Sequence, residues 1–101
     1  MLVEFSIFPI GKDVSLSKYV ARSLKLIEES GLPYRVNPMG TVVEGSWDDV
    51  MDLVKKCHMA ILKDTQRVST SIKIDDRKGK INALDSKIKS VEEKVGKELK
   101  K

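Results

Sequence analysis

Two kinds of apolar periodicity alternate along this chain, and their order restricts the possible folds more than any other feature. Apolar and polar residues alternate, as in half-buried strands, in residues 2–10, 33–40, 41–45 and 67–76. Apolar residues recur at helical spacing in residues 15–31 and 46–64. We therefore expect an α+β fold with a ferredoxin-like βαββαβ antiparallel sheet. Both helices should cover one face, and the first and third strands should be central.

Local signals mark the ends of these elements. Ser15 can cap the first helix and Gly31 can end it, because glycine readily adopts the left-handed conformation found there. Ser46 is a good N-cap for the second helix. Residues 39–40 (Met-Gly) are expected to form the turn of a hairpin between the second and third strands.

The C-terminal segment has a different pattern. Its apolar residues are spaced 3, 4, 3 and 4 apart, as in a heptad seam: Ile81, Leu84, Ile88, Val91 and Val95. This predicts an additional helix over residues 80–99, whose narrow stripe packs on its own domain or on a neighbour. With 101 residues we expect a single domain, with its core in residues 1–77.

Charge and composition limit the classes of partner. The net charge is +4, but residues 78–101 hold eight lysines and four acidic residues and carry the whole excess. Because the chain has few aromatic residues, this favours a solvated helix over a nucleic-acid surface. No apolar run approaches the roughly 18 residues that span a membrane. The single cysteine excludes an intramolecular disulfide, and the expected location is cytoplasmic.

One face of the predicted sheet is polar. Alternation directs Glu4, Ser6, Asn37, Ser71 and Lys73 away from the helices. Glu44 is placed on the same face, because a carboxylate under the helices would need a partner. Two interpretations stay open. The face is solvated, with Glu4 and Glu44 paired to Lys73 and Arg35, or it is a polar floor for a small cationic or heteroaromatic ligand, closed by another subunit.

Catalytic and metal-binding patterns have little support. Cys57 lies on the apolar stripe of the second predicted helix, where a buried small hydrophobic residue is expected. His58 is the only histidine, and no second His or Cys follows at metal-ligand spacing. We therefore expect no catalytic residue, no metal and no cofactor.

Four segments together resemble the YkoF-like thiamine-binding protein family: SIFPIG (6–11), PMGTVVEG (38–45), KKCH (55–58) and RVSTSIKIDDR (67–77). Their order and spacing match over nearly the whole chain. The resemblance implies a ferredoxin-like fold with an extra C-terminal helix. It also implies self-association into homodimers and homotetramers, and binding of thiamine or its hydroxymethylpyrimidine moiety without a reaction.

With this resemblance, the candidate ligand-binding residues are Glu4, Ser6, Asn37, Met39, Thr41, Glu44, Ser71 and Lys73. Glu4 or Glu44 would meet the positive thiazolium ring, and Asn37, Ser71 or Thr41 the hydrogen-bonding edges of the pyrimidine. The predicted function is a non-catalytic carrier, sensor or buffer of a thiamine-like ligand. The alternatives are an anion-binding regulatory or enzyme subunit that uses Lys73, Arg35 and Arg67, and a structural oligomeric protein.

Overall fold

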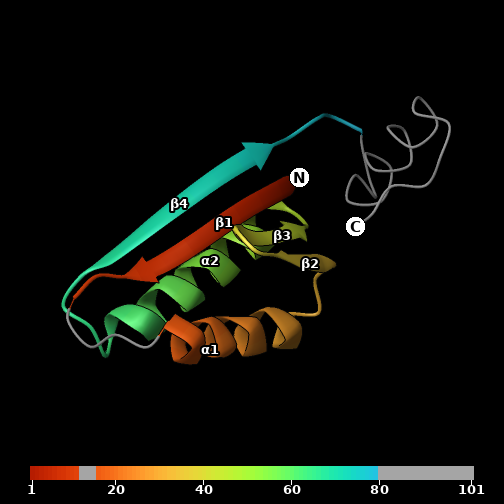
Figure 1. Cartoon of the computed structure of the whole chain (residues 1–101). Coiled ribbons are helices and arrows are strands. Elements are labelled where there is room, and N and C mark those ends of the chain that lie inside the picture. The colour runs from red at the N-terminus through yellow and green to blue at the C-terminus, as the bar shows by residue number, and fades with distance from the viewer. Residues whose placement is uncertain (12–15, 80–101) are drawn as a thin grey trace, which may run out of the picture.

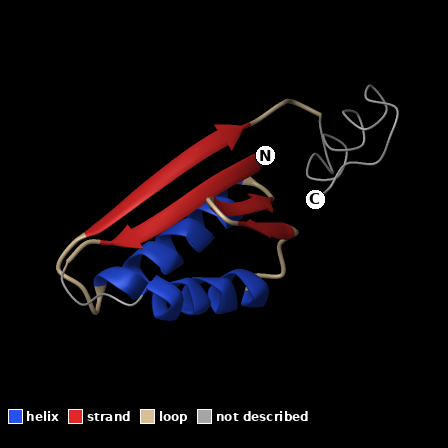
Figure 2. Ribbon diagram, viewed as in Figure 1, coloured by secondary structure: helices blue, strands red, loops and turns tan. Residues whose placement is uncertain are grey.

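Two helices lie on one face of a four-stranded antiparallel sheet (Figure 1 and Figure 2). The structure is a computed structural model that describes residues 1–11 and 16–79. Its elements are β1 (Leu2–Pro9), α1 (Leu16–Glu29), β2 (Tyr34–Asn37), β3 (Gly40–Glu44), α2 (Trp47–Leu62) and β4 (Val68–Asp75). The predicted α+β class and the predicted order of these six elements are confirmed. Neither helix is long and apolar enough to cross a bilayer.

The strands of the sheet differ in length, and this leaves part of one strand without a neighbour. The strand order is β2-β3-β1-β4, so β1 and β3 are central. All eight residues of β1 pair with β4, from Leu2–Asp75 to Pro9–Val68. Only Leu2 to Phe5 pair with β3. The second half of β1 therefore extends past the β2–β3 hairpin (Figure 1).

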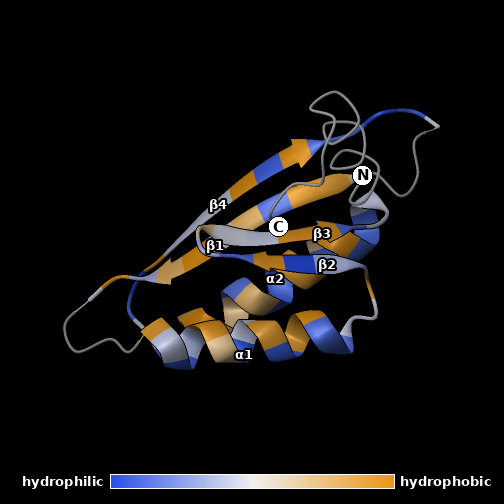
Figure 3. Cartoon of the chain, turned by 45° about the vertical axis from the view of Figure 1, so that its right-hand side comes forward, coloured by the Kyte–Doolittle hydropathy of each residue, from blue (hydrophilic) through white to orange (hydrophobic). Residues whose placement is uncertain are grey.

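The core lies between the central strands and the helices. Hydrophobic and hydrophilic residues alternate along β1 and β4 (Figure 3). On β1, Val3 and Phe5 face the helices and are buried. The stripe predicted on α2 is also buried, with Leu53 in addition: Val50, Val54, Cys57 and Ile61. Burial of this apolar surface drives the two layers together.

The capping signals agree with the structure where it describes them. The Ser46 hydroxyl accepts a hydrogen bond from the backbone N–H of Asp49 at 3.2 Å, which makes Ser46 the N-cap of α2. Gly31 follows α1 with φ of 74°, a conformation that favours glycine. Ser15 lies outside the described residues.

The hairpin turn was predicted one residue too late. Residues 38 and 39 form the turn, and Gly40 is the first residue of β3, paired with Asn37. Pro38 suits the turn because it has no N–H to contribute to a strand ladder. Gly40 suits the strand because a Cβ there would lie 3.1 Å from the backbone oxygen of Phe5.

The helices cover the central strands better than the edges. Ile72 and Ile74 of β4 lie on the helix side as predicted, because they pair with Phe5 and Val3. They are nevertheless 40% and 39% exposed. The predicted C-terminal helix over residues 80–99, with its stripe from Ile81 to Val95, lies outside the described residues.

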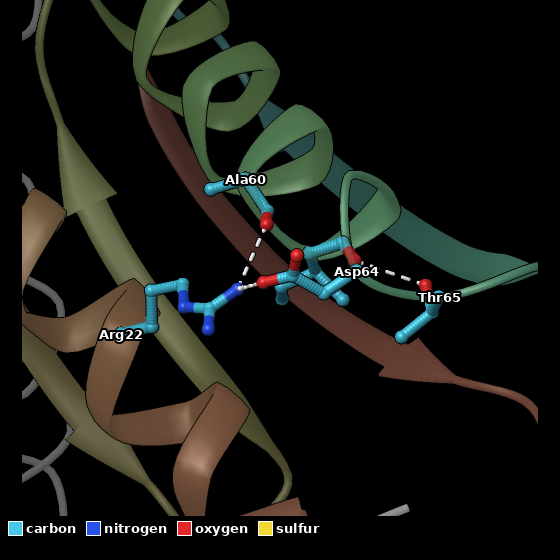
Figure 4. A network of polar contacts seen from close by, with 5 residues as sticks. Arg22, Ala60, Asp64 and Thr65 are labelled. Atoms are coloured by element: carbon cyan, nitrogen blue, oxygen red, sulfur yellow. Dashed lines mark hydrogen bonds and ion pairs between the residues drawn. The ribbon is translucent and has the colours of Figure 1, made fainter.

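A polar network joins the two helices (Figure 4). The Arg22 guanidinium on α1 donates to the carboxylate of Asp64 at 2.7 Å and to the carbonyl of Ala60 at 3.0 Å. It also lies 5.3 Å from the centre of the Tyr19 ring. Beside it, the Thr65 hydroxyl donates to a carbonyl of α2 at 2.9 Å. The two hydrogen bonds of Arg22 hold α1 against the end of α2.

Candidate functional site

A small cavity lies between α1 and the second half of β1, and we call it the α1 pocket. It has a volume of about 120 Å³. Its apolar wall includes Val20, Leu24 and Ile27 of α1. Polar residues from three elements are part of its lining, namely Ser23 of α1, Asn37 of β2 and Thr41 of β3. A mostly apolar cavity with a few converging polar groups is typical of a small-molecule site.

The backbone of β1 adds hydrogen-bonding groups to the α1 pocket. The N–H of Ile10 donates to Arg67 on the β4 side, whereas the carbonyl of Met1 accepts from Gly45 on the β3 side. Because β1 pairs regularly with β4, alternation directs the N–H and C=O of Ile7 toward the β3 side. The last β1–β3 pair is Phe5–Thr41, so β3 does not reach Ile7. Among the described strands none pairs with Ile7 on this side, so its N–H and C=O offer a donor and an acceptor beside the cavity.

A second hollow lies on the other face of the sheet, and we call it the open-face hollow. It has a volume of about 110 Å³. Five of the eight predicted ligand-binding residues line it: Glu4, Ser6, Met39, Ser71 and Lys73. Glu4 is paired with Lys73 across β1 and β4, so one carboxylate and one ammonium group share its floor. Strand alternation therefore placed Glu4, Ser6, Ser71 and Lys73 on this face correctly, and Met39 is a candidate only through the family resemblance.

The two hollows meet at the tip of the β2–β3 hairpin. Phe5, Ser6 and Met39 line both of them. Met39 is 83% exposed at the turn, where a thioether side chain can adapt to different neighbours. A ligand that passes this tip would contact both faces of the sheet.

The remaining predicted residues lie elsewhere. Thr41 lies on the helix side of the sheet, because it pairs with Phe5, and it lines the α1 pocket with Asn37. Glu44 lies on the open face as predicted, but its partner on β1 is Leu2 and not Glu4. Glu44 is not among the residues that line either hollow. Glu4 and Glu44 therefore share the open face on adjacent strands but are not directly opposite each other.

The sequence interpretation missed the contribution of α1 and of the free edge of β1. Helical spacing in residues 15–31 indicates only a helix that packs on the sheet, and it does not identify Ser23 and Val20 as lining a cavity. Unequal strand lengths were the available signal, since β1 has eight residues and β3 has five. A strand that is longer than its neighbour must leave part of one edge unpaired.

The anion-binding alternative needs three cations that the fold keeps apart. Lys73 is on β4 and Arg35 is on β2, at the two opposite edges of the sheet. Arg67 precedes β4, at the far end of that strand from Lys73. Four adjacent strands span about 14 Å between the outer two. The fold therefore places the backbones of these three residues at separate points of the sheet.

Cys57 is buried in the core, as predicted, and it does not reach either hollow. Burial raises the pKa of its thiol to about 11, and a long hydrogen bond from its sulfur to the carbonyl of Ser23, at 3.9 Å, opposes this in part. The next residue, His58, shares a 2.6 Å hydrogen bond with the hydroxyl of Thr70. Within residues 1–11 and 16–79, no group of three His, Cys, Asp or Glu side chains is placed to hold a metal.

This raised pKa predicts a loss of stability at high pH. The ordinary value is 9.0, so between pH 9 and pH 11 the unfolded chain releases the thiol proton and the folded chain keeps it. The free energy of unfolding should fall over this interval by on the order of 2–3 kcal/mol through Cys57. Urea denaturation across the interval measures it. Cys57→Ala keeps every other side chain of the protein and should lose correspondingly less stability, and equal slopes would contradict the assignment.

Comparison with known proteins identifies the family. The family model described as thiamine-binding protein matches residues 3–92. The chain belongs to this thiamine-binding protein family. The UPF0045 protein MJ1052 of Methanocaldococcus jannaschii is 40% identical over 93 residues, which cover 92% of this chain and 93% of that protein. The UPF0045 protein YqgV of Bacillus subtilis is 38% identical and covers 89% of this chain and 92% of its own length.

Solved structures support the same relationship. The crystal structure of MJ1052 matches with a TM-score of 0.83 and covers 91% of this chain and 95% of that one. A Thermotoga maritima protein, TM0486, matches with a TM-score of 0.78 at 27% identity and covers 89% of this chain and 96% of that one. Its name assigns it provisionally to thiamine biosynthesis or salvage. Both solved proteins thus share the fold of this chain over most of its length.

Proposed function

We propose that this protein is a non-catalytic binding protein for thiamine or its hydroxymethylpyrimidine moiety, acting as a carrier, sensor or buffer. Membership of the thiamine-binding protein family carries the proposal. The name of the Thermotoga structure points to the same ligand class. The described residues supply two hollows with the chemistry that the two halves of thiamine require.

The pyrimidine ring is assigned to the α1 pocket. At about 120 Å³ the cavity is smaller than a site for a drug-sized ligand and suits a single ring. An aminopyrimidine presents a donor beside an acceptor, and the N–H and C=O of Ile7 present the complementary pair. Asn37 and Thr41 can form hydrogen bonds with the remaining polar edge of the pyrimidine ring. The apolar wall of α1 packs against the ring face.

The thiazolium ring is assigned to the open-face hollow. Its fixed positive charge requires a carboxylate, and Glu4 is the carboxylate in the lining of that hollow. The path from one hollow to the other passes Met39 at the hairpin tip. The pairing of Glu4 with Lys73 weakens the attraction, so the charge contact supplements the binding of the pyrimidine.

Isothermal titration calorimetry with thiamine, with hydroxymethylpyrimidine and with inorganic phosphate tests the ligand class. We expect both organic ligands to bind and phosphate to give no heat of binding. Mass spectrometry of the protein isolated without added ligand provides an independent readout. Saturable binding of phosphate alone would favour the anion-binding alternative.

Substitution of the two open-face carboxylates tests the orientation of the ligand. Glu4→Gln keeps the shape of the side chain and removes its charge, so it should weaken thiamine binding by about tenfold, equivalent to about 1.4 kcal/mol. Hydroxymethylpyrimidine carries no thiazolium and should bind unchanged. Glu44→Gln is the matched control, because Glu44 lies on the same face outside both hollows. An equal loss in both variants would contradict the assignment of the thiazolium to Glu4.

The proposal extends to assembly and location. We propose a ferredoxin-like domain with its core in residues 1–77 and a C-terminal helix over residues 80–99. In this proposal the protein is cytoplasmic, forms homodimers and homotetramers, and has no nucleic-acid or membrane partner. A second subunit on the open face would enclose the shallow hollow beside Glu4 and so complete the site. Light scattering at micromolar concentration measures the assembly, and a monomer would contradict it.

A further inference from the structure

An apolar surface runs along the outer side of the molecule where β4 forms the edge of the sheet. Val43, Val3 and Ile74 are paired neighbours across β3, β1 and β4. The two valines on the central strands are fully buried, whereas Ile74 is 39% exposed. Two residues along the strands, Phe5 of β1 is 4% exposed and its partner Ile72 of β4 is 40% exposed. On the helix side of the sheet, the side chains of Val3 and Phe5 on β1 are therefore buried, whereas those of their partners on β4 are partly exposed to solvent.

One side of α2 continues this surface. His58 contacts Thr70 on β4, so its side of α2 is the side that faces β4. Met51 and Trp47 precede His58 by seven and eleven residues, which places them on the same side of the helix. Met51 is half-buried and Trp47 is 56% exposed. We call the surface made by these two residues with Ile72 and Ile74 the β4 flank.

The chain itself provides a matching apolar stripe directly after β4. Asp75 ends β4 next to Ile74, and Gly79, with φ of 74°, closes a turn at residues 78–79. The stripe from Ile81 to Val95 follows at once. As a helix this stretch would span about 21 Å at 1.5 Å per residue. The eight residues of β4 span about 26 Å at roughly 3.3 Å per residue, so the two lengths agree.

We infer that residues 81–95 pack as a helix on the β4 flank of the same chain, antiparallel to β4 and beside α2. A stripe of two apolar residues per heptad suits a narrow surface of this kind, whereas α1 and α2 each bury a broader face. The short connection through Gly79 favours the same chain over a second copy, because it holds the segment close to the surface. The inference concerns the side of the molecule away from the α1 pocket and stands independently of the ligand.

Trp47 makes the inference measurable, because it is the only tryptophan in the chain. In the full-length protein a packed segment shields the indole ring from water. Ile88→Asp places a charge in the middle of the stripe and should release the segment. The acrylamide quenching constant of the tryptophan fluorescence should then rise about twofold, and its emission should shift to longer wavelength, because the large indole ring becomes solvated.

Ser86→Asp is the matched control, since residue 86 lies on the opposite side of a helix with this stripe and its quenching should stay at the wild-type value. Circular dichroism shows whether each variant folds, and Ile88→Ala replaces Ile88→Asp if it does not. Quenching that is the same in wild type and in both Ile88 variants would overturn the inference. A quenching constant of the wild type that falls as the protein concentration rises would also overturn the inference, since a second copy of the chain would then shield Trp47.

Discussion

Ser23→Leu should lower the affinity for thiamine and for hydroxymethylpyrimidine by about 100-fold, because overpacking of a well-formed cavity costs on the order of 1–3 kcal/mol. Ser23 lines the α1 pocket from the middle of α1, and a leucine there fills much of a cavity of about 120 Å³. Leucine is also a better helix former than serine, so α1 should persist. Calorimetric titration of both ligands provides the measurement.

Lys25→Leu is the control for this variant. Lys25 is exposed on the same helix, so the substitution adds the same side chain without entering the pocket. It should bind both ligands as the wild type does. If Ser23→Leu also retains its affinity while remaining folded, the pyrimidine ring does not occupy the α1 pocket, and the open-face hollow becomes the better candidate.

Phe5→Ala should destabilise the fold by about 3–5 kcal/mol, a large part of the 5–15 kcal/mol that stabilises a typical domain. Phe5 is 4% exposed, belongs to the core and lines both hollows. Its removal leaves a cavity where the sheet meets the site. The midpoint of thermal unfolding should fall by at least about 10 °C, since 1 kcal/mol corresponds to roughly 4–8 °C in a domain of this size.

Phe8→Ala tests whether this loss depends on position. Phe8 belongs to the same strand, and it is 48% exposed. Its replacement removes the same atoms and should lower the free energy of unfolding by less than about 2 kcal/mol. The reason is that folding of the protein buries much less of the Phe8 side chain than of the Phe5 side chain. Similar losses in the two variants would mean that Phe5 is not the central core residue that its burial indicates.

The sequence predicted which face of each strand is buried much better than it predicted register. Alternation on β1 and β4 placed Glu4, Ser6, Ser71 and Lys73 on one side, because the two-residue period of a strand leaves only two choices. The position of Glu44 relative to Glu4 depends instead on where the β1–β3 ladder begins. That ladder starts at Leu2–Glu44, a pairing set by the hairpin turn, and the turn was predicted one residue too late.

The α1 pocket could not be predicted from periodicity. Its lining comes from four separate elements, and its existence depends on β1 extending beyond Gly40. Helical spacing identifies residues that pack on the sheet, but it does not distinguish those that pack tightly from those that border a cavity. Similarly, the pattern that placed Ile72 and Ile74 on the helix side gives no information on how far two helices reach across four strands.

The complete pairing of β1 with β4 has a consequence for biosynthesis. Among the four strands of this sheet, β1 leaves the ribosome before the others, and it lies between β3 and β4. Until β4 has been synthesised, one edge of β1 remains exposed, and the helices have an incomplete sheet to pack against. Contacts between such distant parts of a chain form slowly, so the nascent protein should gain most of its cooperative stability only after β4 has emerged from the ribosome.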